Sequence, residues 1–165
     1  MSRAFVKEGD GDLEPLPDLP ISPHPNYVTP RGLAALQDRL LRLQTTLAGL
    51  KARPERLDKL PEAAAERDIR YIEARLRSAI LIDPTSLPLT EVAFGLAVTV
   101  ADAHGAQTTY EITGEDEADA PLGRIAPQSP LARALIGAQV GDAVIWRKPS
   151  GAITLEIVSI AHADP

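Results

Sequence analysis

The stretch Leu33-Ala-Ala-Leu36-Gln-Asp-Arg-Leu40-Leu-Arg-Leu43-Gln-Thr-Thr-Leu47-Ala-Gly-Leu50 decides the fold of this 165-residue chain. Six of its leucines recur at alternating steps of three and four residues, the heptad spacing of a helix that packs along one partner helix. A second apolar series with the same steps follows at Ala65, Ile69, Ile72, Leu76 and Ala79. Together the two series predict an antiparallel helical hairpin with a charged tip.

Prolines set the expected ends of both helices. Pro30 suits the first position of a helix, and Pro54 disfavours helical geometry at the residue before it, so we expect the first helix over 30–52. Pro61 opens a second helix over 61–82 by the same argument. Each arm would then be roughly 33 Å long.

The 28 residues before the hairpin have a different composition. Prolines stand at positions 15, 17, 20, 23 and 25 with acidic residues such as Glu14 and Asp18 among them, and we expect this composition to bury too little apolar area to offset the entropy of ordering. We expect an extended, largely disordered arm, and an acidic docking tail is the functional alternative.

From residue 93 onward the apolar period shortens from near 3.6 to near 2. This pattern predicts a small antiparallel sheet with one short helix over 130–136, which together with the hairpin makes an α+β protein. The expected strands cover residues 93–101, 107–114, 143–148 and 152–161. The expected domains are the arm 1–28, the hairpin 29–83, a linker 84–92 and a C-terminal domain 93–163.

Composition excludes several classes of site. The net charge of -6 argues against a protein that wraps nucleic acid with its whole surface. The absence of cysteine excludes disulfides and thiolate metal sites. The three histidines are scattered, and we find no glycine-rich phosphate loop or nucleophile elbow, so we expect neither a metal of its own nor autonomous catalysis. No apolar run has the length of a membrane span or of a signal peptide, so we expect a soluble, cytoplasmic, monomeric protein.

Several ordered segments resemble the bacterial transcript-cleavage factors of the Gre family. The start of the first helix, Tyr27-Val-Thr-Pro-Arg-Gly32, and the end of the second, Ile72-Glu-Ala-Arg-Leu-Arg-Ser-Ala-Ile-Leu-Ile-Asp83, are similar to the family's hairpin. In the C-terminal half the resemblance is carried by Phe94-Gly95, Tyr110-Glu-Ile-Thr-Gly-Glu-Asp-Glu-Ala-Asp119, Ser129-Pro-Leu-Ala-Arg-Ala-Leu-Ile-Gly137, Val140-Gly-Asp142 and Pro149-Ser-Gly151.

The resemblance implies a coiled-coil hairpin followed by a C-terminal domain of FKBP-like fold. It also implies that the C-terminal domain grips the rim of the secondary channel of RNA polymerase while the hairpin enters the channel. The cleaving members of the family carry two acidic tip residues that help to hold a magnesium ion in the polymerase active centre. Any magnesium would thus be shared with the polymerase, and contact with nascent RNA would be indirect.

The tip of this chain departs from the family. Its sequence lacks the string Gly-Asp-x-x-Glu-Asn-Ala-Glu, and the hairpin is shorter by two turns per arm, or roughly 11 Å of reach. Glu55 and Asp58 flank the expected midpoint and Glu62 starts the second helix, so these three are the substitute carboxylates. The alternative is that they are ordinary solvated charges.

Two further sets of charged residues are candidates for contacts. Arginines along the hairpin would face RNA or the channel, or else be mixed charges on a solvated surface. The leading ones are Arg39, Arg42 and Arg53, and Arg67, Arg70, Arg75 and Arg77 belong to the same set. The candidates for polymerase binding are Glu115, Asp116, Asp119, Ser129, Pro130 and Arg133.

These observations lead to one hypothesis and three alternatives. We expect a regulator of elongation that binds RNA polymerase and occupies the secondary channel without strong cleavage activity, and that is at most a stimulator of the polymerase's own RNA cleavage. Within the family, the alternative is a working cleavage factor. Outside it, the alternatives are a chaperone or peptidyl-prolyl isomerase, suggested by fold alone, and a hairpin that self-associates through its leucines.

Overall fold

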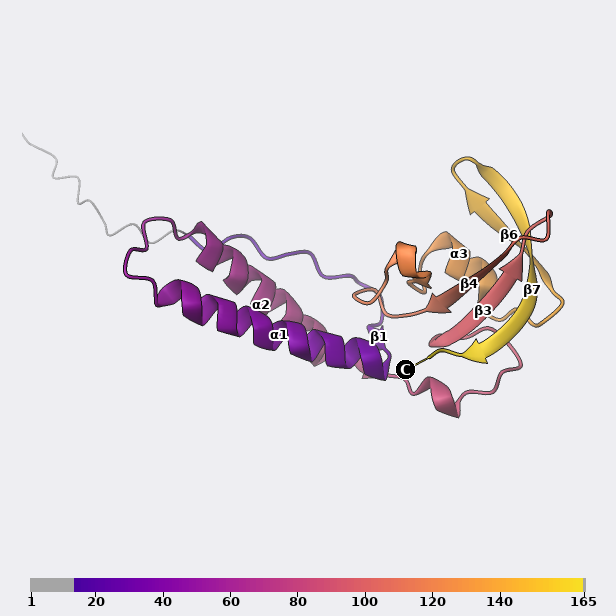
Figure 1. The fold of residues 1–165 in the computed structure, drawn as a ribbon, viewed down its shortest axis with the longest axis horizontal. Coiled ribbons are helices and arrows are strands. Elements are labelled where there is room, and N and C mark those ends of the chain that lie inside the picture. The colour runs from indigo at the N-terminus through magenta and orange to yellow at the C-terminus, as the bar shows by residue number, and fades with distance from the viewer. Residues whose placement is uncertain (1–13, 165) are drawn as a thin grey trace, which may run out of the picture.

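The chain forms a two-helix hairpin and a small mixed sheet that lie end to end along the long axis of the molecule (Figure 1). This computed structural model describes residues 14–164. The α+β architecture predicted from the change of apolar period is confirmed. Within the described residues, no helix is both long enough and apolar enough to cross a membrane.

The hairpin consists of α1, Pro30–Lys51, and α2, Leu60–Ser78. Thr29 caps α1, because its Oγ1 accepts a hydrogen bond from the amide of Gly32 at 2.9 Å. Proline stands among the first residues of both helices, as the sequence predicted.

The leucine seam packs α1 against α2, and its centre lies near the base of the hairpin. Leu36 and Ile72 are buried there together with Val28. Leu33, Leu40 and Leu43 pack partly buried against this cluster, whereas Leu41, which is off the seam, is 63% exposed. A pair of helices covers only one side of each seam residue, so the large seam side chains that are buried lie near the base, where the chain adds Val28.

The second helix ends earlier than predicted. We expected it to reach residue 82, but it ends at Ser78, and Ala79 has an extended backbone. The next two residues form β2, Ile80–Leu81, which pairs in parallel with β1, Tyr27–Val28. Because this pairing satisfies the backbone groups that a further helical turn would have used, the strand replaces the turn.

The C-terminal sheet is mixed rather than wholly antiparallel. Its order is β5-β4-β3-β7-β6, and every pair is antiparallel except β4 with β5. The sequence pattern missed β5 because a strand of two residues shows no period. The strands are β3, Leu96–Ala101; β4, Gln107–Ile112; β5, Arg124–Ile125; β6, Ala143–Lys148; and β7, Gly151–His162.

One face of this sheet packs against α3, Pro130–Leu135, and forms the core of the domain. Ser129 caps α3 through its Oγ, which accepts from the amide of Ala132. The core is aliphatic, as expected from the low aromatic content. It comprises Val92, Leu96, Val98, Val100, Ile112, Leu131, Leu135, Leu155, Ile157 and Ile160. Two single turns of 3-10 helix, Pro84–Ser86 in the linker and Ala120–Leu122, complete the fold.

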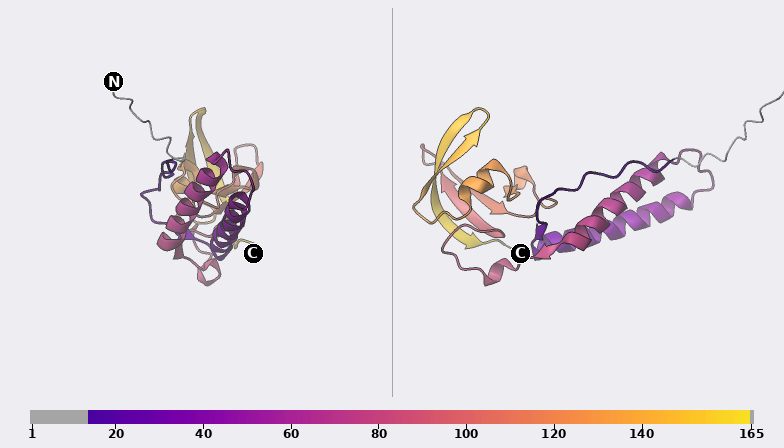
Figure 2. Two further views of the ribbon diagram at one scale, coloured as in Figure 1. Left: turned by 90° about the vertical axis from the view of Figure 1, so that its left-hand side faces the viewer. Right: turned by 180° about the vertical axis from the view of Figure 1, so that it is seen from behind.

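Residues 14–26, which we call the strap, run beside α2 from β1 toward the tip of the hairpin (Figure 2). The sequence predicted a disordered arm over 1–28, of which residues 1–13 lie outside the described part. The strap has no regular secondary structure, which agrees with its prolines, but it makes side-chain contacts with α2 that the composition did not predict.

We predict that Ile72→Ala lowers the free energy of unfolding by about 3 kcal/mol, because it opens a cavity at a seam position that is completely buried. Urea denaturation followed by circular dichroism measures the change. The matched control is Leu41→Ala, which should stay within about 0.5 kcal/mol of the wild type. Equal losses for the two variants would contradict the assignment of the seam.

Candidate functional site

The tip of the hairpin is closed by Arg53. Its Nε donates to the carbonyl of Leu50 at 3.0 Å and its Nη2 donates to the carbonyl of Asp58 at 3.1 Å. The side chain thus joins the end of α1 to the residues just before α2. Arg53, which the sequence offered as a channel-facing residue, is therefore engaged within the tip itself.

Two of the three tip carboxylates have structural partners. Glu62 is only 5% exposed, and its two oxygens accept from Nε and Nη2 of Arg56 at 2.8 and 2.5 Å. These hydrogen bonds hold the pKa of Glu62 below its usual value. Asp58 accepts from the amide of Leu60 at 3.0 Å, while Glu55 is exposed.

The tip does not assemble a metal site from these carboxylates. Among residues 14–164 there is no group of three or more histidine, cysteine, aspartate or glutamate residues placed to hold a metal ion. Magnesium requires a nearly ideal set of oxygen ligands, and Glu62 already gives both oxygens to Arg56. The donor set at the tip therefore does not fit a magnesium ion of its own.

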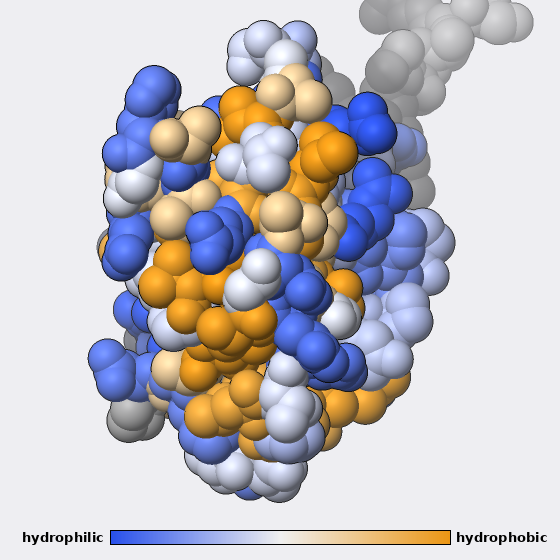
Figure 3. Space-filling view, turned by 90° about the vertical axis from the view of Figure 1, so that its right-hand side faces the viewer, coloured by the Kyte–Doolittle hydropathy of each residue, from blue (hydrophilic) through white to orange (hydrophobic). Residues whose placement is uncertain are grey.

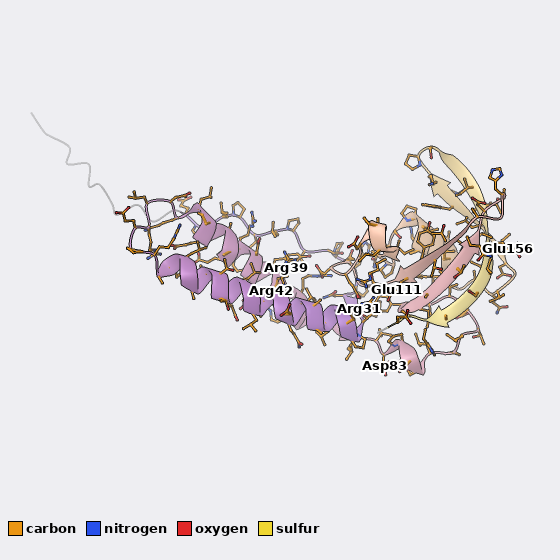
Figure 4. The ribbon with its side chains drawn as sticks, viewed as in Figure 1. Arg31, Arg39, Arg42, Asp83, Glu111 and Glu156 are labelled. Atoms are coloured by element: carbon orange, nitrogen blue, oxygen red, sulfur yellow. The ribbon has the colours of Figure 1, made fainter. Side chains whose placement is uncertain are left out.

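Arg39 and Arg42 lie along the hairpin, away from the junction with the C-terminal domain (Figure 4). Both side chains are exposed. Arg42 pairs with Asp38 one turn earlier on α1 at 2.5 Å, in a contact open to solvent. Both arginines therefore lie on the exposed surface of α1.

Most acidic side chains of the acidic loop, residues 114–119, are turned toward the hairpin, whereas Asp119 is exposed. Asp116 accepts from Nε of Arg75 at 2.6 Å and from the hydroxyl of Tyr71 at 2.5 Å. Glu115 lies 3.4 Å from the Arg75 Nη2. Because Arg75 and Tyr71 belong to α2, Glu115 and Asp116 face the hairpin rather than solvent.

Arg75 is the centre of this junction, and it is only 1% exposed. Besides Asp116 it donates to Oδ1 of Asn26 at 2.7 Å, and Asn26 in turn donates to the carbonyl of Arg75 at 2.8 Å. Three separate parts of the chain thus meet at one guanidinium. Burial and the hydrogen bond to Asp116 raise the pKa of the nearby Tyr71 to about 12.

A second arginine joins α1 to the same domain. Arg31 pairs with Glu117 of the acidic loop at 2.7 Å and with Glu111 of β4 at 2.5 Å (Figure 4). Its Nη1 also donates to the carbonyl of Asp164. Burial alone would lower the pKa of Arg31, but the hydrogen bonds to Glu117 and Glu111 outweigh it and raise the pKa above its ordinary value.

Two glycines allow the hairpin and the loop to approach closely. A Cβ at Gly32 would lie 2.9 Å from Oε1 of Glu117, and a Cβ at Gly114 would lie 2.6 Å from the backbone oxygen of Tyr27. The second contact is with backbone, so a side chain at Gly114 would force the two parts of the molecule apart. The junction is therefore a fitted interface and not a loose linker.

The remaining candidates for polymerase contact lie on the C-terminal domain. Asp119, Pro130 and Arg133 are exposed, whereas Ser129 is partly buried and caps α3. The end of the domain remote from the hairpin shows apolar surface interspersed with polar side chains (Figure 3). Exposed apolar residues of the domain include Leu122, Ile136, Val140 and Ile145.

The role of Arg75 was missed because sequence reasoning grouped it with the exposed arginines. One signal was present: Arg75 stands three residues after Ile72 and next to Leu76, at the edge of the apolar face of α2. A charge at that position must find a partner, since it is carried toward the interior of the molecule. The partner itself lies 41 residues away and has no local signature.

The comparisons with known proteins place the chain among elongation factors. Residues 87–162 match the family "Transcription elongation factor, GreA/GreB, C-term". Transcription elongation factor GreA of Methylococcus capsulatus is 38% identical over 157 residues, which cover 82% of this chain and 96% of that protein.

Other relatives match over a shorter stretch. GreA of Pseudomonas aeruginosa is 46% identical over 103 residues, covering 61% of this chain. The chain spans about 65% of the length of that relative and about 64% of GreA from Pseudomonas putida. Among solved structures, a GreA/GreB factor from Nitrosomonas europaea is 20% identical with a TM-score of 0.42, covering 83% of this chain and 99% of that one.

We predict that Arg75→Ala lowers the free energy of unfolding by about 3 kcal/mol, because it leaves the largely buried carboxylate of Asp116 without its cation. Urea denaturation measures the change. Arg42→Ala breaks an ion pair of similar length in full contact with solvent and should cost at most about 1 kcal/mol. The junction would not be the stabilising contact if the two substitutions had the same effect.

We also predict that Glu62 makes the stability of the hairpin depend on pH. Its pKa is lower in the folded chain than its ordinary value of 4.5, so the unfolded chain binds more protons and stability rises with pH in this range. The contribution is complete above pH 4.5 and is lost as the pH falls through the folded pKa. As the pH is lowered below 4.5, the denaturation midpoint should fall less steeply for Glu62→Gln than for the wild type.

The matched control is Glu55→Gln, which removes an exposed tip carboxylate and should keep the steeper decline of the wild type. If Glu62→Gln declined as steeply as the wild type, the pairing with Arg56 would not be the source of the dependence.

Proposed function

Because the chain belongs to the GreA/GreB family of transcription elongation factors, we propose that it binds RNA polymerase and modulates elongation. The C-terminal domain supplies the docking surface, and the hairpin enters the secondary channel. Within this role the chain acts as a regulator that occupies the channel without strong stimulation of transcript cleavage.

The docking part of the proposal is supported by the position of the family match. Residues 87–162 cover nearly the whole C-terminal domain and include the acidic loop and α3. Asp119, Pro130 and Arg133 are the exposed members of the candidate contact set. We assign the polymerase contact to these three and to the apolar surface near them, because Glu115 and Asp116 are turned toward the hairpin.

One observation supports weak cleavage activity: two of the carboxylates at the tip, Glu62 and Asp58, accept hydrogen bonds from other groups of the hairpin. Glu62 is buried and doubly bonded to Arg56, and Asp58 accepts from the backbone at the start of α2. Stimulating the polymerase's metal chemistry needs carboxylate oxygens that are free to enter a coordination shell. Here one acidic residue is neutralised by an arginine and a second has a structural hydrogen bond.

The reach of the hairpin supports the same conclusion. The 22 residues of α1 extend over roughly 33 Å. A hairpin shortened by two turns per arm would end roughly 11 Å short of where a longer one ends. Ligands bind magnesium at about 2 Å, so a deficit of that size exceeds what side-chain flexibility can bridge.

The second candidate function is a working cleavage factor. It is favoured by Glu55, which is exposed at the tip, and by its neighbour Asp58. These two would approach the polymerase's magnesium only if the hairpin entered more deeply than its length suggests. Cleavage by this route would depend on both carboxylates.

The test uses stalled, backtracked elongation complexes with radiolabelled RNA. We expect the wild-type chain to compete with an active cleavage factor for the polymerase, and to shorten the RNA at least about tenfold more slowly than that factor, which corresponds to about 1.4 kcal/mol of barrier. The variant with Glu55→Ala and Asp58→Ala should compete equally well and leave the slow rate unchanged.

Two results would overturn the proposal in different ways. Rapid shortening that the double substitution abolishes would identify a cleavage factor. Failure to compete, with no shortening of the RNA, would remove the secondary channel as the binding site.

A further inference from the structure

The N-terminal part of the strap is hydrogen-bonded to α2 through Arg70. Arg70 donates from Nε to Oδ1 of Asp18 at 2.6 Å and from Nη2 to the carbonyl of Leu16 at 2.8 Å. Both edges of the guanidinium are thus taken by the strap, which lies along the helix in the views of Figures 1 and 2. An extended acidic segment occupies a basic position on the hairpin.

The two ends of the strap are held very differently. At its C-terminal end Asn26 is buried and exchanges hydrogen bonds with Arg75, and β1 follows directly. Toward its N-terminal end the Asp18 side chain is 75% exposed, so water and salt screen its pair with Arg70. A cavity of about 200 Å³ lies between this distal part and α2. The distal strap, residues 14–21, is therefore weakly docked, whereas Asn26 is firmly anchored.

The buried residues of the seam lie outside the distal strap. The seam of α2 that meets α1 runs through Ile72 and Leu76. The distal strap covers a neighbouring face, formed by Arg70, Glu73, Ala74 and Arg77, and it also lies beside Tyr71, which packs against the seam cluster. Release of residues 14–21 would expose this face and leave both the seam and the Arg75 junction in place.

We propose that the distal strap is an autoinhibitory segment: docked through Arg70, it covers the outer face of α2, and entry of the hairpin into RNA polymerase requires its release. This inference rests on the proposed function. A channel that encloses the hairpin would contact the face of α2 that the docked strap covers. The strap therefore makes the hairpin thicker on that side. Only molecules with the strap released can bind RNA polymerase. The apparent dissociation constant for the polymerase is the intrinsic one divided by the fraction of such molecules.

The first experiment measures docking directly. The chain has no cysteine, so introduced pairs carry spin labels without interference. Labels at Glu14→Cys and Gln44→Cys, both exposed positions, should give a narrow distance distribution when the strap is docked. Asp18→Asn removes the charge that pairs with Arg70 and should add a broad component.

The matched control is Asp38→Asn, which breaks the exposed pair with Arg42 on α1, away from the strap. This control should keep the narrow distribution. A broad distribution in the otherwise unaltered labelled chain, or an identical response to Asp18→Asn and Asp38→Asn, would overturn the docking of the strap through Arg70.

The second experiment measures binding to RNA polymerase by fluorescence anisotropy. Asp18→Asn should raise the affinity about two- to fivefold, because it enlarges the competent fraction. Removal of residues 1–21 should raise it at least as much.

Each remaining outcome has one meaning. An affinity that falls or stays constant, although the spin labels report release, would overturn autoinhibition while leaving polymerase binding intact. Absence of binding by the wild type and by every variant would overturn the proposed function instead, and the autoinhibitory role with it.

Discussion

The buried guanidinium of Arg75 is the contact on which the arrangement of the molecule depends. A charge with 1% exposure is tolerable only when its partners are fixed, and here they come from the strap and from the acidic loop of the C-terminal domain. Arg31 repeats the arrangement on the other helix with Glu117 and Glu111. Each helix thus contributes one arginine to the same acidic surface, which fixes both the tilt of the hairpin and its rotation about its own axis.

This arrangement divides the acidic residues of the chain by role. The carboxylates that cluster most densely in sequence, at 115–117, hold the two parts together, and the carboxylate at the start of α2 stabilises the tip. Exposed side chains remain on the C-terminal domain, at Arg39 and Arg42 of α1 and at Glu55 of the tip. Several acidic side chains are thus engaged within the molecule, and for this reason we propose that the hairpin occupies the channel without strong stimulation of cleavage.

Local features were predictable from the sequence and distant pairings were not. Pro30 and Pro54 placed the ends of α1 to within a residue, and the short helix expected over 130–136 corresponds to α3. The end of α2 was misjudged because Ile80 and Leu81 continue an apolar run that suits a helix equally well, and only their pairing with Tyr27 and Val28 decides the matter. The junction escaped prediction for the same reason, since Arg75 and Asp116 are each unremarkable until the fold brings them together.

The short parallel pairing of β1 with β2 has a consequence for how such hairpins vary. It joins the residues that enter α1 to those that leave α2, so the chain departs from and returns to one fixed point. The hairpin beyond that point consists of two helices whose register is set by a repeating seam. Whole heptads added to both arms, or removed from both, would leave the base, the junction and the C-terminal domain undisturbed. The length of the hairpin can therefore change by insertion or deletion while the rest of the fold stays the same.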